Sequence, residues 1–232
     1  MSEQSPGVVL VNPNTNRATT AMMGRRLQTA LADMDCNLQV TALTVTAGPA
    51  MITGPGALAD AAGHVVDLVQ GLARVPEDAP RVVVAAFGDP GVPELQDAGF
   101  RVTGIGEAAV RAAVEGGRRF AVATTTPDLA DLITGLVPRA LGKGSAADLF
   151  TGVELTTTEP LVLAEDPVAC REELDAVVRR CLVAGAQRVV IGGGPLGDAA
   201  ADLAGRYPDV IVEPLTAAAA ELSAAAATPR HS

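Results

Sequence analysis

The chain has 232 residues, of which 48% are hydrophobic and only 2% aromatic, so Ala, Val, Leu and Ile must build a core large enough for one or two domains. Its formal net charge of −10 leaves no basic surface for nucleic acid or an anionic membrane, and we expect neither partner. Three cysteines without a CxxC spacing and two histidines are too few for a zinc site or a disulfide framework, so we expect no metal and no cofactor.

The first residues, MSEQSPG, pass directly into an apolar run that begins at Val8. They form neither the basic stretch of a targeting segment nor the roughly 20 apolar residues of a membrane span. We therefore expect a cytoplasmic protein with reduced thiols.

Short β-branched runs alternate with Ala-rich segments of helical period along the chain. Strands are expected at residues 8–11, 38–45, 82–86, 101–103, 120–124, 153–156, 189–191 and 210–212. Helices are expected at residues 17–34, 56–73, 108–116, 128–136, 166–184 and 215–227. This alternation is typical of an α/β fold in which helices connect parallel strands.

The order of these segments repeats. VVLVNPNTN at Val8 resembles FAVATTTPD at Phe120, and VVVAAFGDPG at Val82 resembles VVIGGGPLGD at Val189. The repeat predicts two half-chains of similar topology, near residues 1–107 and 118–227. We assign residues 1–105 and 211–232 to a first flavodoxin-like α/β domain with a parallel sheet, and residues 106–210 to a second, pseudo-symmetric one. Open parallel sheets bind ligands beyond the carboxyl ends of their strands, so we expect the functional site in the cleft between the two domains.

Polar loops follow the first strand of each half. Asn14, Thr15 and Asn16 lie where a strand ends and a helix begins, so their side chains and the free backbone N–H groups are candidates to bind a carboxylate or carbonyl oxygen. The alternative is a turn followed by a helix N-cap, which Asn and Thr also favour. Thr124 and Thr125 occupy the matching position in the second half, while Thr126 before a proline is typical of an N-cap.

Two further loops follow the strands at residues 82–86 and 189–191. Asp89 lies in the first, where a cleft can raise its pKa and make it an acid or base, although an Asp-Pro turn or a helix cap explains it equally well. The second contains Gly193 and Gly194, which allow either close approach of a ligand to the backbone or close packing.

The segment GIGEAA at residues 104–109 matches the GxGxxA pattern of a dinucleotide site, but the strand that follows does not end in an acidic residue. Glu107 can instead face the cleft as a hydrogen-bond acceptor. His64 and His231 fall in a helix and in the C-terminal tail, and Cys36, Cys170 and Cys181 are expected to be packed thiols.

Together these loops resemble the aspartate/glutamate/hydantoin racemase superfamily, most closely its hydantoin and allantoin racemase branch. The resemblance rests on motifs spread over nearly the whole chain: VNPNTN, TAGPA, AFGDPG, GIGEAA, TTT, EDP and IGGGPL. It implies two α/β domains with a small-molecule site between them, assembly into homo-oligomers, and no metal or cofactor. It also places Ala86, Phe87, Gly193 and Gly194 beside Asn14, Thr15, Asn16, Thr124 and Thr125 as substrate-binding residues.

The family resemblance further implies a reaction in which two cysteines on opposite faces of the substrate remove and return a proton. The matching positions here are Ala86 and Gly193, whose side chains can do neither. One hypothesis is therefore an enzyme that moves the proton with another group, Asp89 or Glu107, in an isomerase, lyase, decarboxylase or cyclase reaction on a small carboxylate, cyclic amide or imine. The alternative is a binding protein or pseudoenzyme that keeps the pocket without the reaction.

Overall fold

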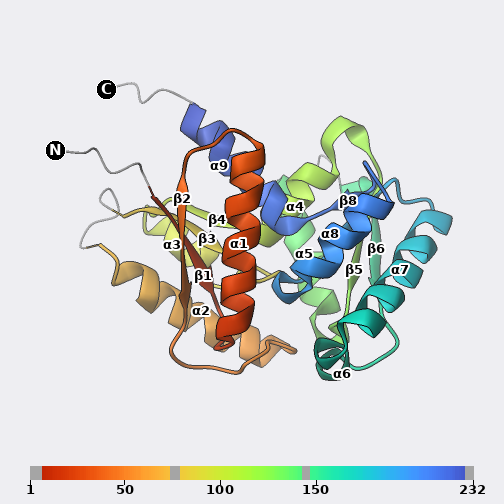
Figure 1. The fold of residues 1–232 in the computed structure, drawn as a ribbon, viewed down its shortest axis with the longest axis horizontal. Coiled ribbons are helices and arrows are strands. Elements are labelled where there is room, and N and C mark those ends of the chain that lie inside the picture. Colours follow the sequence, from red (N-terminus) through yellow and green to blue (C-terminus); the bar gives the residue numbers. More distant parts are fainter. Residues whose placement is uncertain (1–6, 74–78, 143–146, 228–232) are drawn as a thin grey trace.

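The computed structural model describes residues 7–73, 79–142 and 147–227, which contain two four-stranded parallel sheets (Figure 1). The first sheet has the order β2-β1-β3-β4, and its strands are β1 (Gly7–Asn12), β2 (Gln39–Thr44), β3 (Arg81–Val84) and β4 (Val102–Gly104). The second has the order β6-β5-β7-β8, with β5 (Phe120–Thr124), β6 (Phe150–Leu155), β7 (Arg188–Ile191) and β8 (Ile211–Val212). The identical order confirms the predicted α/β fold with two similar halves.

Helices connect the strands of both sheets. They are α1 (Arg17–Asp33), α2 (Pro55–Gln70), α3 (Val92–Asp97), α4 (Ile105–Ala113), α5 (Ala130–Leu141), α6 (Pro160–Glu165), α7 (Pro167–Val183), α8 (Gly197–Arg206) and α9 (Pro214–Ala227). Three of them, α3, α6 and α8, were not expected from the periodicity. In addition, α4 begins at Ile105, three residues before the expected start at residue 108.

Each sheet is covered on both faces, which explains its nearly continuous apolar strands. In β1, Val8 and Leu10 pack into one core cluster, whereas Val9 and Val11 pack into another on the opposite face. Successive side chains of a strand point to opposite faces, so one run of four apolar residues serves two layers of helices.

The last helix of each half lies against the first helix of the other half. Helix α4 packs against α5, helix α9 packs against α1, and α4 and α9 also contact each other. Figure 1 shows α9 running beside α1 on the way back from β8. The domain boundaries at residues 105/106 and 210/211 stay a prediction.

None of the helices in the described part of the chain is both long and apolar enough to span a lipid bilayer.

Candidate functional site

The loops that follow β1, β3, β5 and β7 surround a cavity of about 50 Å³, here called the inner cavity. Both halves of the chain contribute to its wall, which is formed by Asn14, Met51, Ile52, Leu58, Ala85, Ala86, Phe87, Thr124, Thr125, Thr126, Leu129, Ile133, Gly192, Gly193, Gly194, Pro195 and Leu196. This wall contains no Asp, Glu, His, Cys, Lys, Arg or Tyr among the described residues. The inner cavity therefore offers neutral hydrogen-bonding groups and apolar surface, but no side chain that exchanges a proton near neutral pH.

The wall of the inner cavity contains polar groups that are available to a ligand. The Thr124 hydroxyl donates to the carbonyl of Gly192 at 2.7 Å and lies 3.2 Å from the Thr126 hydroxyl. The neighbouring Thr125 is only 3% exposed, yet its hydroxyl has no partner in the described part of the chain. Because the Thr125 Oγ1 makes no hydrogen bond with a described residue and is not fully buried, it is open to the inner cavity and well placed to bind a polar ligand atom.

The NPNTN loop is held in shape by its own asparagines. The side-chain nitrogen of Asn12 lies 2.8 Å from the Asn14 Oδ1 and 2.9 Å from the Thr20 Oγ1, and Asn12 is fully buried. The Asn14 Oδ1 also accepts the backbone N–H of Asn16 at 2.9 Å. Asn14 thus uses its oxygen within the loop, while its amide nitrogen makes no hydrogen bond with a described residue; Asn14 lines the cavity wall.

The other two candidates in this loop have different positions. Thr15 donates through its backbone N–H to the Pro49 carbonyl at 3.0 Å, which joins the loop to the TAGPA segment. Asn16 is the N-cap of α1, where its Oδ1 accepts the N–H of Thr19 at 3.1 Å. Neither contributes to the inner cavity wall; their contacts fit a turn and a helix cap, while Asn16 also lines a second, larger hollow.

Ala86 and Gly193 take equivalent positions, because each lies two residues after the end of β3 or β7, and both line the inner cavity. Gly193 has an extended backbone with φ 171°, and a Cβ there would meet only the Leu196 side chain, at 3.0 Å. A Cβ on Gly194 would instead collide with the carbonyl oxygen of Ala85 and lie 2.8 Å from the Met23 sulfur. Close packing therefore requires glycine at position 194 but not at position 193.

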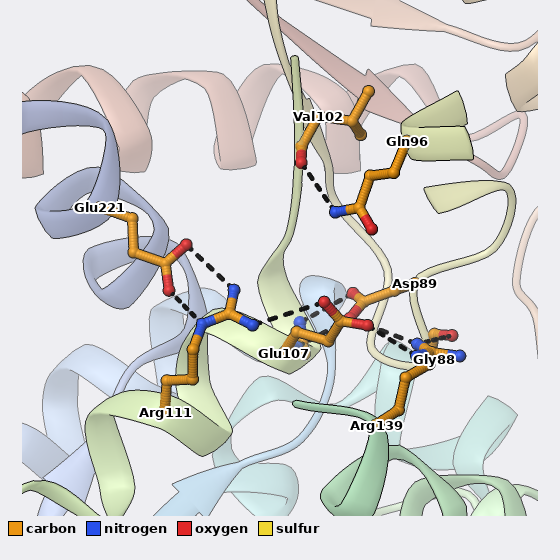
Figure 2. Close-up of polar contacts among 9 residues, drawn as sticks. Gly88, Asp89, Gln96, Val102, Glu107, Arg111, Arg139 and Glu221 are labelled. Atoms are coloured by element: carbon orange, nitrogen blue, oxygen red, sulfur yellow. Dashed lines mark hydrogen bonds and ion pairs between the residues drawn. The ribbon is translucent and has the colours of Figure 1, made fainter. Parts of the chain in front are cut away.

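Asp89 and Glu107 lie together but outside the inner cavity wall (Figure 2). Asp89 is 1% exposed and adopts φ 55°, a left-handed conformation that directs its carboxylate onto the first turn of α4. Its Oδ1 accepts the N–H of Gly106 at 2.8 Å and its Oδ2 accepts the N–H of Glu107 at 2.7 Å. Asp89 thus caps α4 and takes the place that a ligand phosphate would need at a GxGxxA loop.

Glu107 belongs to a chain of ion pairs that crosses three helices (Figure 2). Its Oε1 accepts from the Arg139 Nε of α5 at 2.6 Å, and its Oε2 accepts from Arg111 at 3.4 Å. Arg111 in turn donates through its Nε to Glu221 of α9 at 2.7 Å. Burial raises the pKa of Asp89 to about 7 and the charge of Glu107 adds to this rise, whereas the two backbone hydrogen bonds and Arg139 lower it.

A larger hollow of about 510 Å³, here called the outer basin, shares the wall residues Met51, Thr125, Pro195 and Leu196 with the inner cavity. Its other wall residues come from α6, α7, α8, the start of α1 with its N-cap, and the loop after β2: Asn16, Thr19, Ala50, Pro160, Leu161, Leu163, Ala164, Glu165, Pro167, Cys170, Arg171, Asp198 and Ala199. Our sequence reasoning missed this part of the site, since α6 has six residues and shows no helical period. Pro160 at its first turn is the one local signal of a helix start.

The outer basin is anchored by Glu173 of α7. Its carboxylate accepts the backbone N–H groups of Thr157 and Thr158 at 2.8 and 3.1 Å as well as both threonine hydroxyls. The hydroxyl of Thr158 and these further hydrogen bonds lower the pKa of Glu173 to about 2. Glu173 therefore holds the segment between β6 and α6 in place.

Among the described residues, the three cysteines and His64 are not part of the inner cavity wall. Cys170 is 7% exposed and lines the outer basin, and burial raises the pKa of its thiol. Cys181 is fully buried and Cys36 is half-buried, as expected for packed thiols. His64 lies on α2 away from both hollows, and His231 is outside the described residues.

Two parallel-sheet units with a small-molecule cavity between their strand ends define a class of α/β proteins with a site at the junction of two similar halves. A family model described as Asp/Glu/Hydantoin racemase matches residues 8–222, and the chain belongs to this family. The resemblance drawn from the sequence motifs is thereby confirmed.

Individual relatives agree with this assignment. The chain is 32% identical to a hydantoin racemase of Rhizobium meliloti over 183 residues, which cover 74% of this chain and 73% of the relative. The structure of allantoin racemase from Klebsiella pneumoniae superimposes with a TM-score of 0.80 at 25% identity, covering 96% of this chain and 88% of that one. An arylmalonate decarboxylase variant shares the fold, with a TM-score of 0.63 at 17% identity and coverage of 98% and 97%.

Proposed function

We propose that this protein binds a small carboxylate, cyclic amide or imine-containing molecule in the inner cavity and does not perform two-thiol racemisation. The family and the names of its relatives support a small-molecule ligand. The absence of any ionisable side chain from the described wall of the inner cavity supports the second part, and it is the observation that carries the proposal.

The available donors suggest how such a ligand is held. The amide nitrogen of Asn14 and the hydroxyl of Thr125 are free within the described part of the chain, and both can donate to a carboxylate or carbonyl oxygen. Much of the remaining wall is apolar, with Ala86 and Phe87 among its residues. An inner cavity of about 50 Å³ holds only a small head group, so the rest of the ligand extends past Thr125 and Leu196 into the outer basin.

A second candidate is an enzyme in which Asp89 or Glu107 moves the proton in an isomerase, lyase, decarboxylase or cyclase reaction. Burial raises the pKa of Asp89 to about 7, a value suited to general acid–base catalysis. Because both carboxylates lie outside the inner cavity wall, this candidate requires the 85–91 loop to move when substrate binds. A homo-oligomer in the cytoplasm remains our expectation for either function.

Calorimetric titration with hydantoin, allantoin and aspartate tests the binding proposal. We expect at least one probe to bind, and Thr125→Val to weaken that binding about fivefold, since one buried hydrogen bond contributes about 1 kcal/mol. Thr134→Val is the matched control, because Thr134 lies on the exposed face of α5, where its hydroxyl donates to the Ala130 carbonyl. If none of the three probes binds, or if both variants weaken binding equally, the proposed site is wrong.

Solvent exchange separates the two candidates. In deuterium oxide, proton NMR reports whether the protein labels the carbon next to the carbonyl of a bound probe. We expect no labelling by the wild type. Labelling that Asp89→Asn abolishes establishes the second candidate.

Restoring the two thiols tests the geometry of the cavity. Gly193→Cys is compatible with the extended backbone there, provided the Leu196 side chain shifts slightly. We expect the combination of Ala86→Cys and Gly193→Cys to racemise a hydantoin or aspartate. A folded double variant that binds the probe but never racemises it would count against opposed positions for residues 86 and 193.

A further inference from the structure

The loop of residues 85–91 serves two structures at once. Ala85, Ala86 and Phe87 form part of the inner cavity wall. Two positions further, Asp89 turns back and caps α4 through the N–H groups of Gly106 and Glu107. Any change in this cap is therefore transmitted through one short peptide segment to the wall of the cavity.

Arg139 connects the same loop to the second half of the molecule (Figure 2). Its Nη2 donates to the Gly88 carbonyl at 3.4 Å and lies 3.7 Å from the Asp89 Oδ2, while its Nε donates to Glu107 at 2.6 Å. A single guanidinium on α5 thus contacts the loop, its buried carboxylate and the first turn of α4. The arrangement clamps the loop between the two halves.

Two ionisable side chains act directly on Asp89. Glu107 of α4 opposes its charge and Arg139 of α5 favours it, and one residue further Arg111 pairs with both Glu107 and Glu221 of α9. The other described residues that the structure places against this loop are uncharged: β4 contributes Gly104, and α2 contributes Leu58 near Gly88 and Val65 near Gly91.

We propose that Asp89 is a proton-linked latch, which holds the 85–91 loop against α4 when its carboxylate is charged and releases part of that hold, changing the shape of the inner cavity, when it is protonated. Both oxygens accept a backbone N–H, so an added proton must lie on an oxygen that already accepts one. Protonation therefore weakens at least one charge-assisted hydrogen bond. The proposal goes beyond the proposed function and does not rest on it, because the latch needs no ligand.

Burial places this event in the neutral range, because it raises the pKa of Asp89 to about 7. The two neighbouring charges predict in which direction the midpoint of the Asp89 titration moves when either charge is removed. Removing the positive charge of Arg139 raises the midpoint, and removing the negative charge of Glu107 lowers it, each by about 1 pH unit.

NMR titration of the ligand-free protein across neutral pH is the test. In the wild type we expect the amide signals of Gly106 and Glu107, the Ala86 methyl and the Phe87 ring to shift with one common midpoint near the pKa of Asp89, about 7. Asp89→Asn abolishes the transition at all four sites. Asp175→Asn is the control, since Asp175 is also buried but its pKa is lowered, so the transition stays unchanged.

Two results would overturn the latch. The first is a transition at Gly106 and Glu107 that does not reach Ala86 and Phe87, because the cap would then titrate without any effect on the cavity. The second is a transition that persists in Asp89→Asn. Should that variant not fold, Arg139→Gln and Glu107→Gln decide the matter: midpoints that move up and down respectively support the latch, and any other pair of directions refutes it.

Discussion

Gly104 is the position where one added methyl group should disturb the molecule most directly. A Cβ there would lie 2.5 and 2.6 Å from the two carboxylate oxygens of Asp89. The backbone of Gly104, with φ −86° and ψ 135°, is open to any residue, so the effect of Gly104→Ala is purely steric. The alanine must push Asp89 away from the N–H groups of Gly106 and Glu107.

The magnitude follows from the contacts that are lost. Two hydrogen bonds to a charged group contribute about 1.5–3 kcal/mol each, and overpacking a buried site costs about 1–3 kcal/mol. Partial relaxation of the loop recovers some of this, so we expect Gly104→Ala to lower the free energy of unfolding by roughly 3–6 kcal/mol. That is a large share of the 5–15 kcal/mol typical of a folded protein.

Urea unfolding followed by far-UV circular dichroism suits this chain, which has no tryptophan. Measurements at about pH 8 keep Asp89 charged, because its pKa is about 7. The control is Gly63→Ala, on an open surface of α2 with no atom within 4 Å of the new Cβ; we expect it to stabilise the protein by about 0.5–1 kcal/mol.

A double-mutant cycle identifies the cause. If the alanine acts through Asp89, then Asp89→Ala costs less in the Gly104→Ala background than in the wild type, by at least about 1 kcal/mol. Additive effects, or a Gly104→Ala variant as stable as the wild type, would refute the steric reasoning.

The remaining predictions concern pH, glycine packing and the asparagine loop. Burial raises the pKa of Asp89 in the folded protein to about 7, above the value of 3.8 expected in the unfolded chain. The stability that Asp89 contributes is therefore complete below about pH 4 and is lost as the pH rises through about 7. In Asp89→Asn, a plot of unfolding free energy against pH should be flatter over this range. The pH dependence that Glu173 gives to stability has the opposite sign, because hydrogen bonds lower its pKa to about 2. The stability that Glu173 contributes is present above pH 4.5 and is lost as the pH falls toward 2. Glu173→Gln should remove this dependence from acid-unfolding curves. Thermal unfolding should show that Gly194→Ala, which collides with the Ala85 carbonyl, lowers the midpoint far more than Gly193→Ala, which meets only a flexible leucine; equal effects would contradict the packing argument. Asn12→Ala removes the fully buried amide that positions Asn14. In urea unfolding the variant should lose about 2–4 kcal/mol of stability, and it should no longer bind the probe. A stable variant that still binds would show that the loop does not need this amide.

Much of the fold could be predicted because its strands are short, buried and β-branched. The strand Phe120–Thr124 was expected at these same bounds, since all five residues are buried and a proline follows closely. Helix α8 escaped prediction because its buried residues are mostly small: Gly197, Ala199, Ala200 and Leu203. Such residues pack closely in the fold but leave no strong helical period in the sequence.

The candidate site also contains residues that the sequence could predict and one, Asp89, whose position it could not. Asn14, Ala86, Thr125 and Gly193 each follow a strand of a parallel sheet, and the topology alone brings strand ends together. The position of Asp89 depends on a left-handed backbone and on contacts with residues 106 and 107, which are remote in sequence. The small residues at positions 104 and 106 were the available signal, but their meaning depends on knowing what approaches them.

Helices α4 and α9 each pack against a helix of the other half of the chain, and this packing affects how the molecule unfolds. A fragment that ended before α9 would uncover the apolar faces of α1 and α4 together and would leave Arg111 without Glu221. In the intact protein, unfolding of either half would remove helices that complete the core of the other half. We therefore expect the two repeats to unfold in a single cooperative transition, and we expect these shared helices to limit how far the cavity between the repeats can change shape.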